Sequence, residues 1–183
     1  MAVMRDVYET LKRGAAEIAP KLEQANKLDD EIKSGRFSND VNKEKLLEMQ
    51  GIRGEIRRDA ERIEDEANRH ITAYIEQVQQ ANELRPEELT DDLKLLSAGV
   101  KLAERDIVAM LKRNKTNRTM QQIIFNYADE HGIGTGGFVY DNGLSSIPAA
   151  EGLRGTVRMY IDHWIDTDKA VEMLNKFFPG VGA

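Results

Sequence analysis

A chain of 183 residues with 32% charged and 40% hydrophobic residues is less apolar than a compact globule and is typical of long exposed helices. Its net charge of −6 is spread evenly along the chain, which argues against bulk capture of nucleic acid or anionic membrane. Cysteine is absent, and this excludes disulfides, thiolate catalysis and cysteine-type zinc sites.

The composition changes near Pro86. The 85 residues before it hold only three of the eleven aromatic residues and four of the fourteen glycines. We therefore predict an all-α protein in which a long helical hairpin precedes short-helix modules. The expected parts are a coiled-coil-like hairpin at 1–85, a three-helix module at 86–132, a glycine-rich loop at 133–148 and a C-terminal helical docking segment at 149–183.

The first helix is indicated by apolar residues that recur every seven positions, among them Leu11, Ile18 and Ile32. Pro20 removes one helical hydrogen bond, so we expect it to bend or split this helix. The helix should end before Gly35, a residue suited to the left-handed conformation that follows many helices.

A second, longer helix is expected from about 40 to 84, with Gly51 and Gly54 as a kink or a point of close approach. It outlasts the first helix by more than a dozen residues, and its surplus apolar stripe must pack against the C-terminal modules or another subunit. We favour another subunit and predict a homo-oligomer. The expected seam consists of Ile56, Ile63, His70, Tyr74 and Val78.

The pattern of the rest of the chain predicts short helices. Thr90-Asp91-Asp92 should cap a helix that stops at Gly99, another should cover 104–113, and Asn117 should cap a third that ends at Gly132. Phe138-Val139-Tyr140 is a candidate arm of a short hairpin. Two last helices, at about 149–164 and 167–178, carry the most hydrophobic surface. We expect docking on a partner through Trp164, Met173, Leu174, Phe177 and Phe178.

No catalytic signature is recognisable in the sequence. Gly132–Gly137 formally matches G-x-G-x-x-G, but a dinucleotide site needs a strand before the motif and a helix after it, so we interpret it as a flexible hinge. The histidines at 70, 131 and 163 lack the spacing of metal ligands. We predict a protein that is not an enzyme and has no cofactor or metal.

Four basic residues lie within seven positions and join two of the short helices: Lys112, Arg113, Lys115 and Arg118. This segment resembles the turn of a helix-turn-helix, so the alternative function is a coiled-coil dimeric DNA-binding regulator that uses residues 104–131. Against it, the would-be recognition helix ends in Asp129 and Glu130, which would repel phosphate.

One stretch resembles a known class of proteins. It begins Leu89-Thr-Asp-Asp-Leu-Lys-Leu-Leu-Ser-Ala-Gly-Val-Lys-Leu and continues to Asn117-Arg-Thr-Met120 and Tyr127-Ala-Asp-Glu-His-Gly132. Residues 89–132 are similar to a segment of small helical head-assembly proteins from tailed phages and prophages of Gram-positive bacteria. Ala103 departs from the capping Ser or Thr expected there. The resemblance implies a scaffold or a virion component that docks on coat or other head proteins.

The sequence has no run of 18 apolar residues and no signal-peptide pattern at its start. We therefore expect no membrane partner, and a location in the virion or the host cytoplasm.

Overall fold

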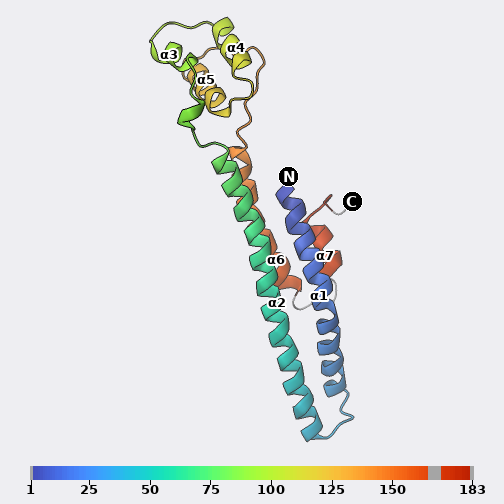
Figure 1. Ribbon diagram of the computed structural model, residues 1–183. Coiled ribbons are helices and arrows are strands. Elements are labelled where there is room, and N and C mark those ends of the chain that lie inside the picture. The colour runs from blue at the N-terminus through green and yellow to red at the C-terminus, as the bar shows by residue number, and fades with distance from the viewer. Residues whose placement is uncertain (1, 165–169, 182–183) are drawn as a thin grey trace. The chain divides into compact units, whose positions relative to one another are not determined.

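The computed structural model describes residues 2–164 and 170–181, without the side chains of Trp164 and residues 170–172. These residues form seven α-helices and two short 3₁₀ helices, and no strand occurs among them, so the predicted all-α class is confirmed. The chain divides into two compact units: unit 1 comprises residues 1–74 and 148–183, and unit 2 comprises residues 75–147. Figure 1 shows the helices in the order of the chain.

Unit 1 is built on two long helices, α1 (Ala2–Lys33) and α2 (Asn39–Gln80), which pack against each other. The inward stripe of α1 includes Leu11, Ile18 and Leu22, all buried as their spacing predicts. Gly35 follows α1 with φ +64°, which confirms the expected helix end.

Of the bend or split predicted at Pro20, the split does not occur. The helix runs unbroken from Ala2 to Lys33 with Pro20 on its exposed side. The missing proline N–H removes one hydrogen bond, but Ile18 and Leu22 are buried on either side of it. Their packing stabilises the helix on both sides of Pro20, because tertiary burial outweighs one lost bond.

The predicted point of close approach between the helices, at Gly51 and Gly54, is also wrong. Gly51 and Gly54 lie within an unbroken α2, and no atom lies within 4 Å of a Cβ placed on Gly51. The close contact is instead at Gly14 of α1, which is buried against Ile63 of α2. A Cβ on Gly14 would lie 2.5–2.9 Å from three side-chain atoms of Ile63.

The C-terminal helices complete unit 1. Helix α6 (Ile147–Trp164) buries one stripe of small and large apolar residues, and α7 (Ala170–Phe177) packs on α1. The members of the α6 stripe are Ala150, Leu153, Val157, Tyr160 and Ile161. The predicted docking segment at 149–183 is not separate, because it belongs to the same unit as the hairpin. The first unit boundary lies after residue 74 rather than 85, and the predicted module at 86–132 and loop at 133–148 fall within one unit except for residue 148.

Unit 2 is a small helical core around α3 (Asp92–Ser97), α4 (Glu104–Arg113) and α5 (Arg118–Glu130), near the predicted bounds. Two 3₁₀ helices, η1 (Pro86–Glu88) and η2 (Leu144–Ser146), lie on either side in sequence. Asn117 caps α5, because its Oδ1 accepts a hydrogen bond from the Met120 N–H at 2.9 Å. At Ala103 the missing cap is replaced by Asp106, whose carboxylate accepts from the Ala103 N–H at 2.9 Å.

The candidate hairpin arm at 138–140 is not a strand. Phe138 packs against the core of unit 2, and the Tyr140 ring stacks on Phe125 of α5 with centroids 5.5 Å apart. The segment therefore packs on the helical core of unit 2 through its rings.

The close contact between Gly14 and Ile63 predicts that a change of glycine to alanine affects stability differently at positions 14 and 51. Gly51→Ala should stabilise the protein by up to about 1 kcal/mol, because alanine is the better helix former and nothing lies near the new methyl group. Gly14→Ala gains the same propensity but overpacks Ile63, at a cost of about 1–3 kcal/mol. Urea denaturation followed by circular dichroism should therefore rank Gly51→Ala above Gly14→Ala by about 1–3 kcal/mol. Equal stabilisation by both would contradict the close contact.

Candidate interaction surfaces

The aromatic C-terminal end is mostly core. Leu174 is 0% exposed and Phe178 1% exposed, which removes these two predicted docking residues from the surface. The Phe178 ring meets Tyr8 of α1 edge-on at 6.3 Å, and Tyr8 donates a hydrogen bond to Asn175 Oδ1 at 3.3 Å. Met173 and Phe177 are half-buried, and the Trp164 side chain lies outside the described residues. The sequence showed the hydrophobicity of this end but not the surface that covers it.

The predicted oligomer seam is largely internal as well. Ile56 and Ile63 are 2% and 1% exposed within unit 1, while His70 and Tyr74 are half-buried there. Val78 belongs to unit 2 and is half-buried. α2 also meets α6 of the same chain, where Arg158 pairs with Glu64 at 3.0 Å and Arg154 donates to Thr72 at 2.8 Å. The buried stripe is thus no longer an argument for a second subunit.

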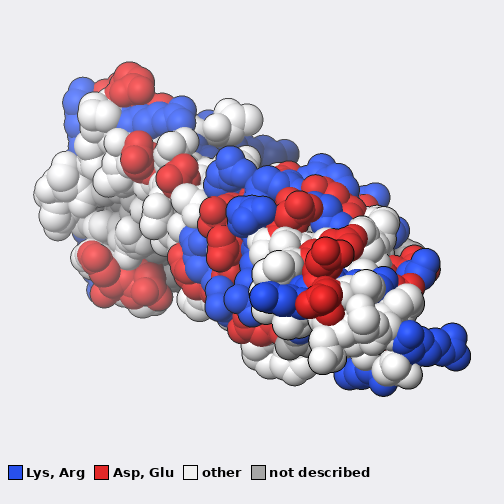
Figure 2. All heavy atoms as spheres, turned by 90° about the horizontal axis from the view of Figure 1, so that it is seen from below, with Lys and Arg blue, Asp and Glu red and all other residues white. Residues whose placement is uncertain are grey.

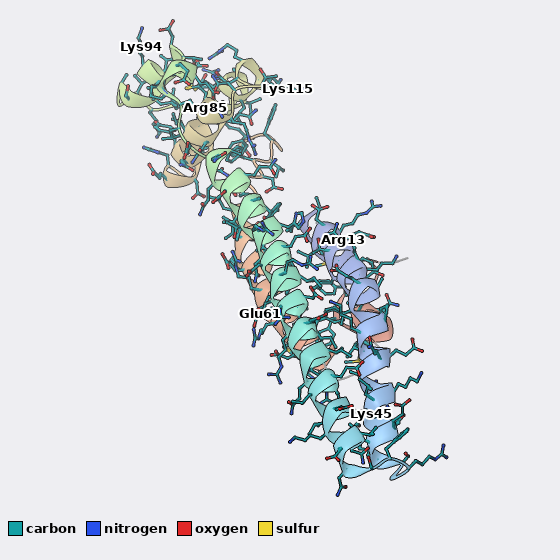
Figure 3. All side chains as sticks on the ribbon, turned by 60° about the horizontal axis from the view of Figure 1, so that its bottom comes forward. Arg13, Lys45, Glu61, Arg85, Lys94 and Lys115 are labelled. Atoms are coloured by element: carbon teal, nitrogen blue, oxygen red, sulfur yellow. The ribbon has the colours of Figure 1, made fainter. Side chains whose placement is uncertain are left out.

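Ion pairs join α1 to α2 along unit 1. Lys21 bonds Asp59 at 2.7 Å and Glu55 at 3.2 Å, and Lys45 bonds Glu31 at 2.6 Å. Lys45 lies near the hairpin connection (Figure 3). The hydrogen bond with Lys21 holds the pKa of Asp59 below its usual value and raises the pKa of Lys21. On the face seen in Figure 2, positive and negative side chains are interspersed rather than gathered into one-signed patches.

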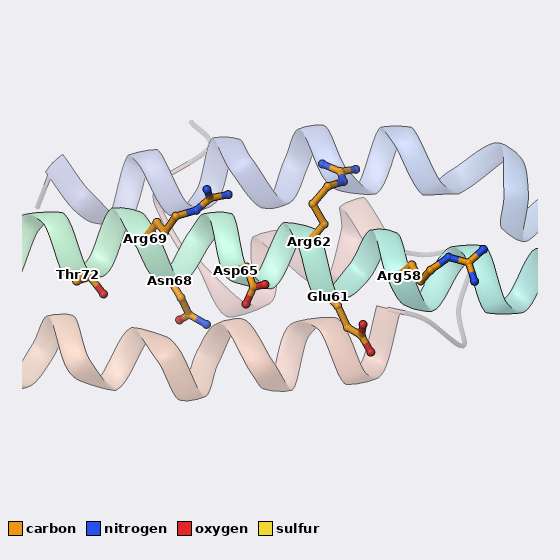
Figure 4. A pocket seen from close by; sticks show the side chains of 7 residues that line it. All are labelled: Arg58, Glu61, Arg62, Asp65, Asn68, Arg69 and Thr72. Carbon is orange, nitrogen blue, oxygen red and sulfur yellow. The ribbon is translucent and has the colours of Figure 1, made fainter.

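The outer face of α2 carries an open hollow of about 640 Å³. All of its lining side chains come from α2. In Figure 4 Arg62 and Arg69 extend toward α1, while Glu61 and Asn68 extend toward α6. The lining side chains alternate in charge, which suits the recognition of another charged helical surface. The lining residues are Arg58, Glu61, Arg62, Asp65, Asn68, Arg69 and Thr72.

The basic segment of unit 2 is partly committed to the fold. Arg113 donates hydrogen bonds to the nearly buried Asp92, and the Asn114 side chain donates to Asp92 Oδ2 at 2.7 Å. These bonds lower the pKa of Asp92, and the hydrogen bond from Arg113 has the largest effect. Lys112, Lys115 and Arg118 are exposed and have no ion pair among the residues described. Two carboxylates, Asp92 and Glu88, therefore lie beside the predicted nucleic-acid segment, since Glu88 accepts from the Thr119 N–H at 3.4 Å.

The glycine-rich loop packs closely rather than forming a phosphate cradle. A Cβ on Gly134 would lie 2.8 Å from the Glu104 carboxylate, and one on Gly136 would lie 2.5 Å from Val108. Both neighbours belong to α4, and a carboxylate at this place would repel phosphate. Within the part of the chain that the structure describes, no cluster of three or more His, Cys, Asp or Glu residues could hold a metal ion.

The described helices include none that is both long and apolar enough to cross a membrane. Exposed large apolar side chains do occur in both units. In unit 1 they lie near the hairpin connection and on α6, and in unit 2 they lie mostly between residues 84 and 100. The members are Phe37, Val41, Leu46, Leu47 and Met159 in unit 1, and Leu84, Leu89, Leu95, Val100, Val139 and Leu144 in unit 2.

Comparison with known proteins adds no relative: no family model, no curated protein and no solved structure matches this chain.

The burial of Phe178 predicts a structural effect rather than a binding effect. Phe178→Ala should destabilise unit 1 by about 3–5 kcal/mol, because it leaves a cavity between α1 and α7. Phe37→Ala removes a ring of the same size from a 40% exposed site and should cost about 1 kcal/mol or less. Thermal and urea unfolding of the two variants measures this difference. Equal stability would show that Phe178 is not a core residue.

The Asp92 bonds predict a pH-dependent effect. The folded-state pKa of Asp92 is lowered, so its contribution is present above the unfolded pKa of about 4 and is lost as pH falls through the folded value. Asp92→Asn should cost about 1–3 kcal/mol near pH 7 and much less near pH 2. Asp91→Asn is the control, because Asp91 is exposed and, among the described residues, forms its ion pair with the exposed Lys94. Urea denaturation at both pH values checks this, and a cost of Asp92→Asn that does not change with pH would contradict it.

Proposed function

We propose that this chain is a non-enzymatic structural protein of phage particle assembly, located in the virion or the host cytoplasm. In this role unit 1 is the self-associating helical part, and unit 2 docks on coat or another head protein. The docking surface is thereby assigned to unit 2 rather than to the C-terminal helices, whose Leu174 and Phe178 are buried.

One observation supports this assignment above others. The stretch that resembles phage head-assembly proteins, residues 89–132, lies wholly within unit 2 and carries three exposed large apolar residues, Leu89, Leu95 and Val100. Their neighbour Leu96 is buried in the core formed by α3, α4 and α5. A small core that fixes apolar side chains toward solvent is suited to contact with another protein.

The experiment is mass spectrometry of purified precursor and finished particles from the phage or prophage that encodes the chain. Presence in precursors alone would identify a scaffold, and presence in finished particles would identify a virion component. Leu95→Asp should reduce incorporation at least about tenfold, because it places a charge in the proposed apolar contact. Lys101→Asp, an exposed site in the same unit, is the control and should incorporate normally.

Absence of the chain from both kinds of particle would contradict the proposal. The alternative, a dimeric DNA-binding regulator, would then be tested first. It would rely on Lys112, Lys115 and Arg118, because Arg113 is engaged by Asp92. It predicts salt-sensitive binding to duplex DNA that is lost in Lys112→Glu.

A further inference from the structure

The outer face of α2 between residues 40 and 62 has no covering element within unit 1. Its members recur at spacings of three and four residues and therefore share one side of the helix, opposite the buried Ile56 and Ile63. They are Asp40, Glu44, Leu47, Gly51, Gly54, Arg58 and Arg62. One end of this face is the hollow in Figure 4, where Arg58 extends away from the neighbouring helices.

The centre of this face is flat and apolar. Leu47 is 61% exposed. A Cβ added to Gly51 would have no atom within 4 Å, and one added to Gly54 would have only the Arg58 guanidinium, at 3.8 Å. Neither glycine has a positive φ, so neither is required by the backbone. Nothing within unit 1 accounts for the two helix-weakening residues Gly51 and Gly54. A second helix lying across them would account for both, because small residues allow two helices to approach closely.

The charges on this face are arranged symmetrically about Gly51. Glu44 and Arg58 lie seven residues before and after it, and Asp40 and Arg62 lie eleven residues before and after it. Two copies of the face, laid antiparallel with Gly51 opposite Gly51, would place each acid against an arginine of the other copy. Leu47 of each copy would then lie over the strip formed by Gly51 and Gly54 of the other copy.

Glu44 and Arg58 are the pair that would set this register. Among the residues that the structure describes, neither has an ion-pair partner, and both are exposed. Arg62 is already bonded to Glu17 of α1, so its contribution across copies would be smaller. Opposite charges across an interface fix the register and exclude alignments that juxtapose like charges.

We propose that two copies of this chain associate through this face of α2 as an antiparallel dimer with two-fold symmetry, with Glu44 of each copy against Arg58 of the other. This inference deepens the proposed function and rests on it, because it identifies the surface of the self-associating unit. A two-fold contact uses the same patch on both copies, which is what a self-complementary face provides. The contact spans roughly 33 Å of helix, so it is small and of modest affinity.

The test uses the full chain and charge reversal. Glu44→Arg and Arg58→Glu each place like charges at both ends of the contact, so each variant alone should dimerise at least about tenfold more weakly than the wild type. Mixed with each other, the two variants should form a heterodimer close to wild-type strength, and the double variant should recover self-association. Sedimentation equilibrium up to about 1 mM measures all four.

Two further variants separate the contact from general charge effects. Arg57→Glu makes the same charge change one residue away, on another side of α2, and should dimerise as the wild type does. Gly51→Leu fills the strip without a change of charge and improves helix propensity, so the fold is kept while association falls at least about tenfold. A wild type that stays monomeric throughout, or a mixture no stronger than its components, would overturn the proposal.

The outcomes also separate this inference from the proposed function. If the chain is found in particles but stays monomeric in solution, the dimer proposal is overturned and the particle role stands. The charge-swap pattern together with absence from particles would overturn the particle role and leave the dimer intact.

Discussion

The structure of unit 1 depends on the burial of one apolar stripe along α2. α2 has 42 residues and mixed charges on its outer side, and most of the stability of such a helix in a protein comes from packing of its inward side. α1 covers part of this stripe, with Gly14 allowing Ile63 close approach. α6 lies along the later part, where Arg154 and Arg158 bond to the side of α2. Both ends of the chain are therefore recruited to one core.

This arrangement changes which surfaces are open to partners. Residues that carry the strongest apolar signal, such as Phe178 and Ile63, are used inside the chain. The open surfaces are the outer face of α2 and the exposed apolar side chains of unit 2. The first is self-complementary in charge, and the second includes Leu89, Leu95 and Val100 within residues 89–132. The proposed structural role would use these as separate contacts, one for its own copies and one for another protein.

Local signals in the sequence were sufficient for most element boundaries. Gly35 marks the end of α1 and Asn117 the start of α5, because a left-handed glycine and a side-chain cap act within a few residues. The non-local outcomes were not accessible in this way. Nothing near Phe178 indicates that Tyr8, at the other end of the chain, covers it. Likewise Pro20 and Gly14 have local propensities against helix. Pro20 is tolerated because Ile18 and Leu22 are buried on either side of it, and the role of Gly14 depends on Ile63 of α2.

The most direct test of a single shared core in unit 1 is native-state hydrogen exchange of the intact chain, resolved by peptide. We expect amides of α6 to exchange with the same free energy of opening as those of α1 and of residues 56–71 of α2, since these segments share one core. Unit 2 should open with its own, different free energy. Rapid exchange in α6 while α1 and α2 stay protected would contradict the shared core, because the hairpin would then be stable without the C-terminal helices.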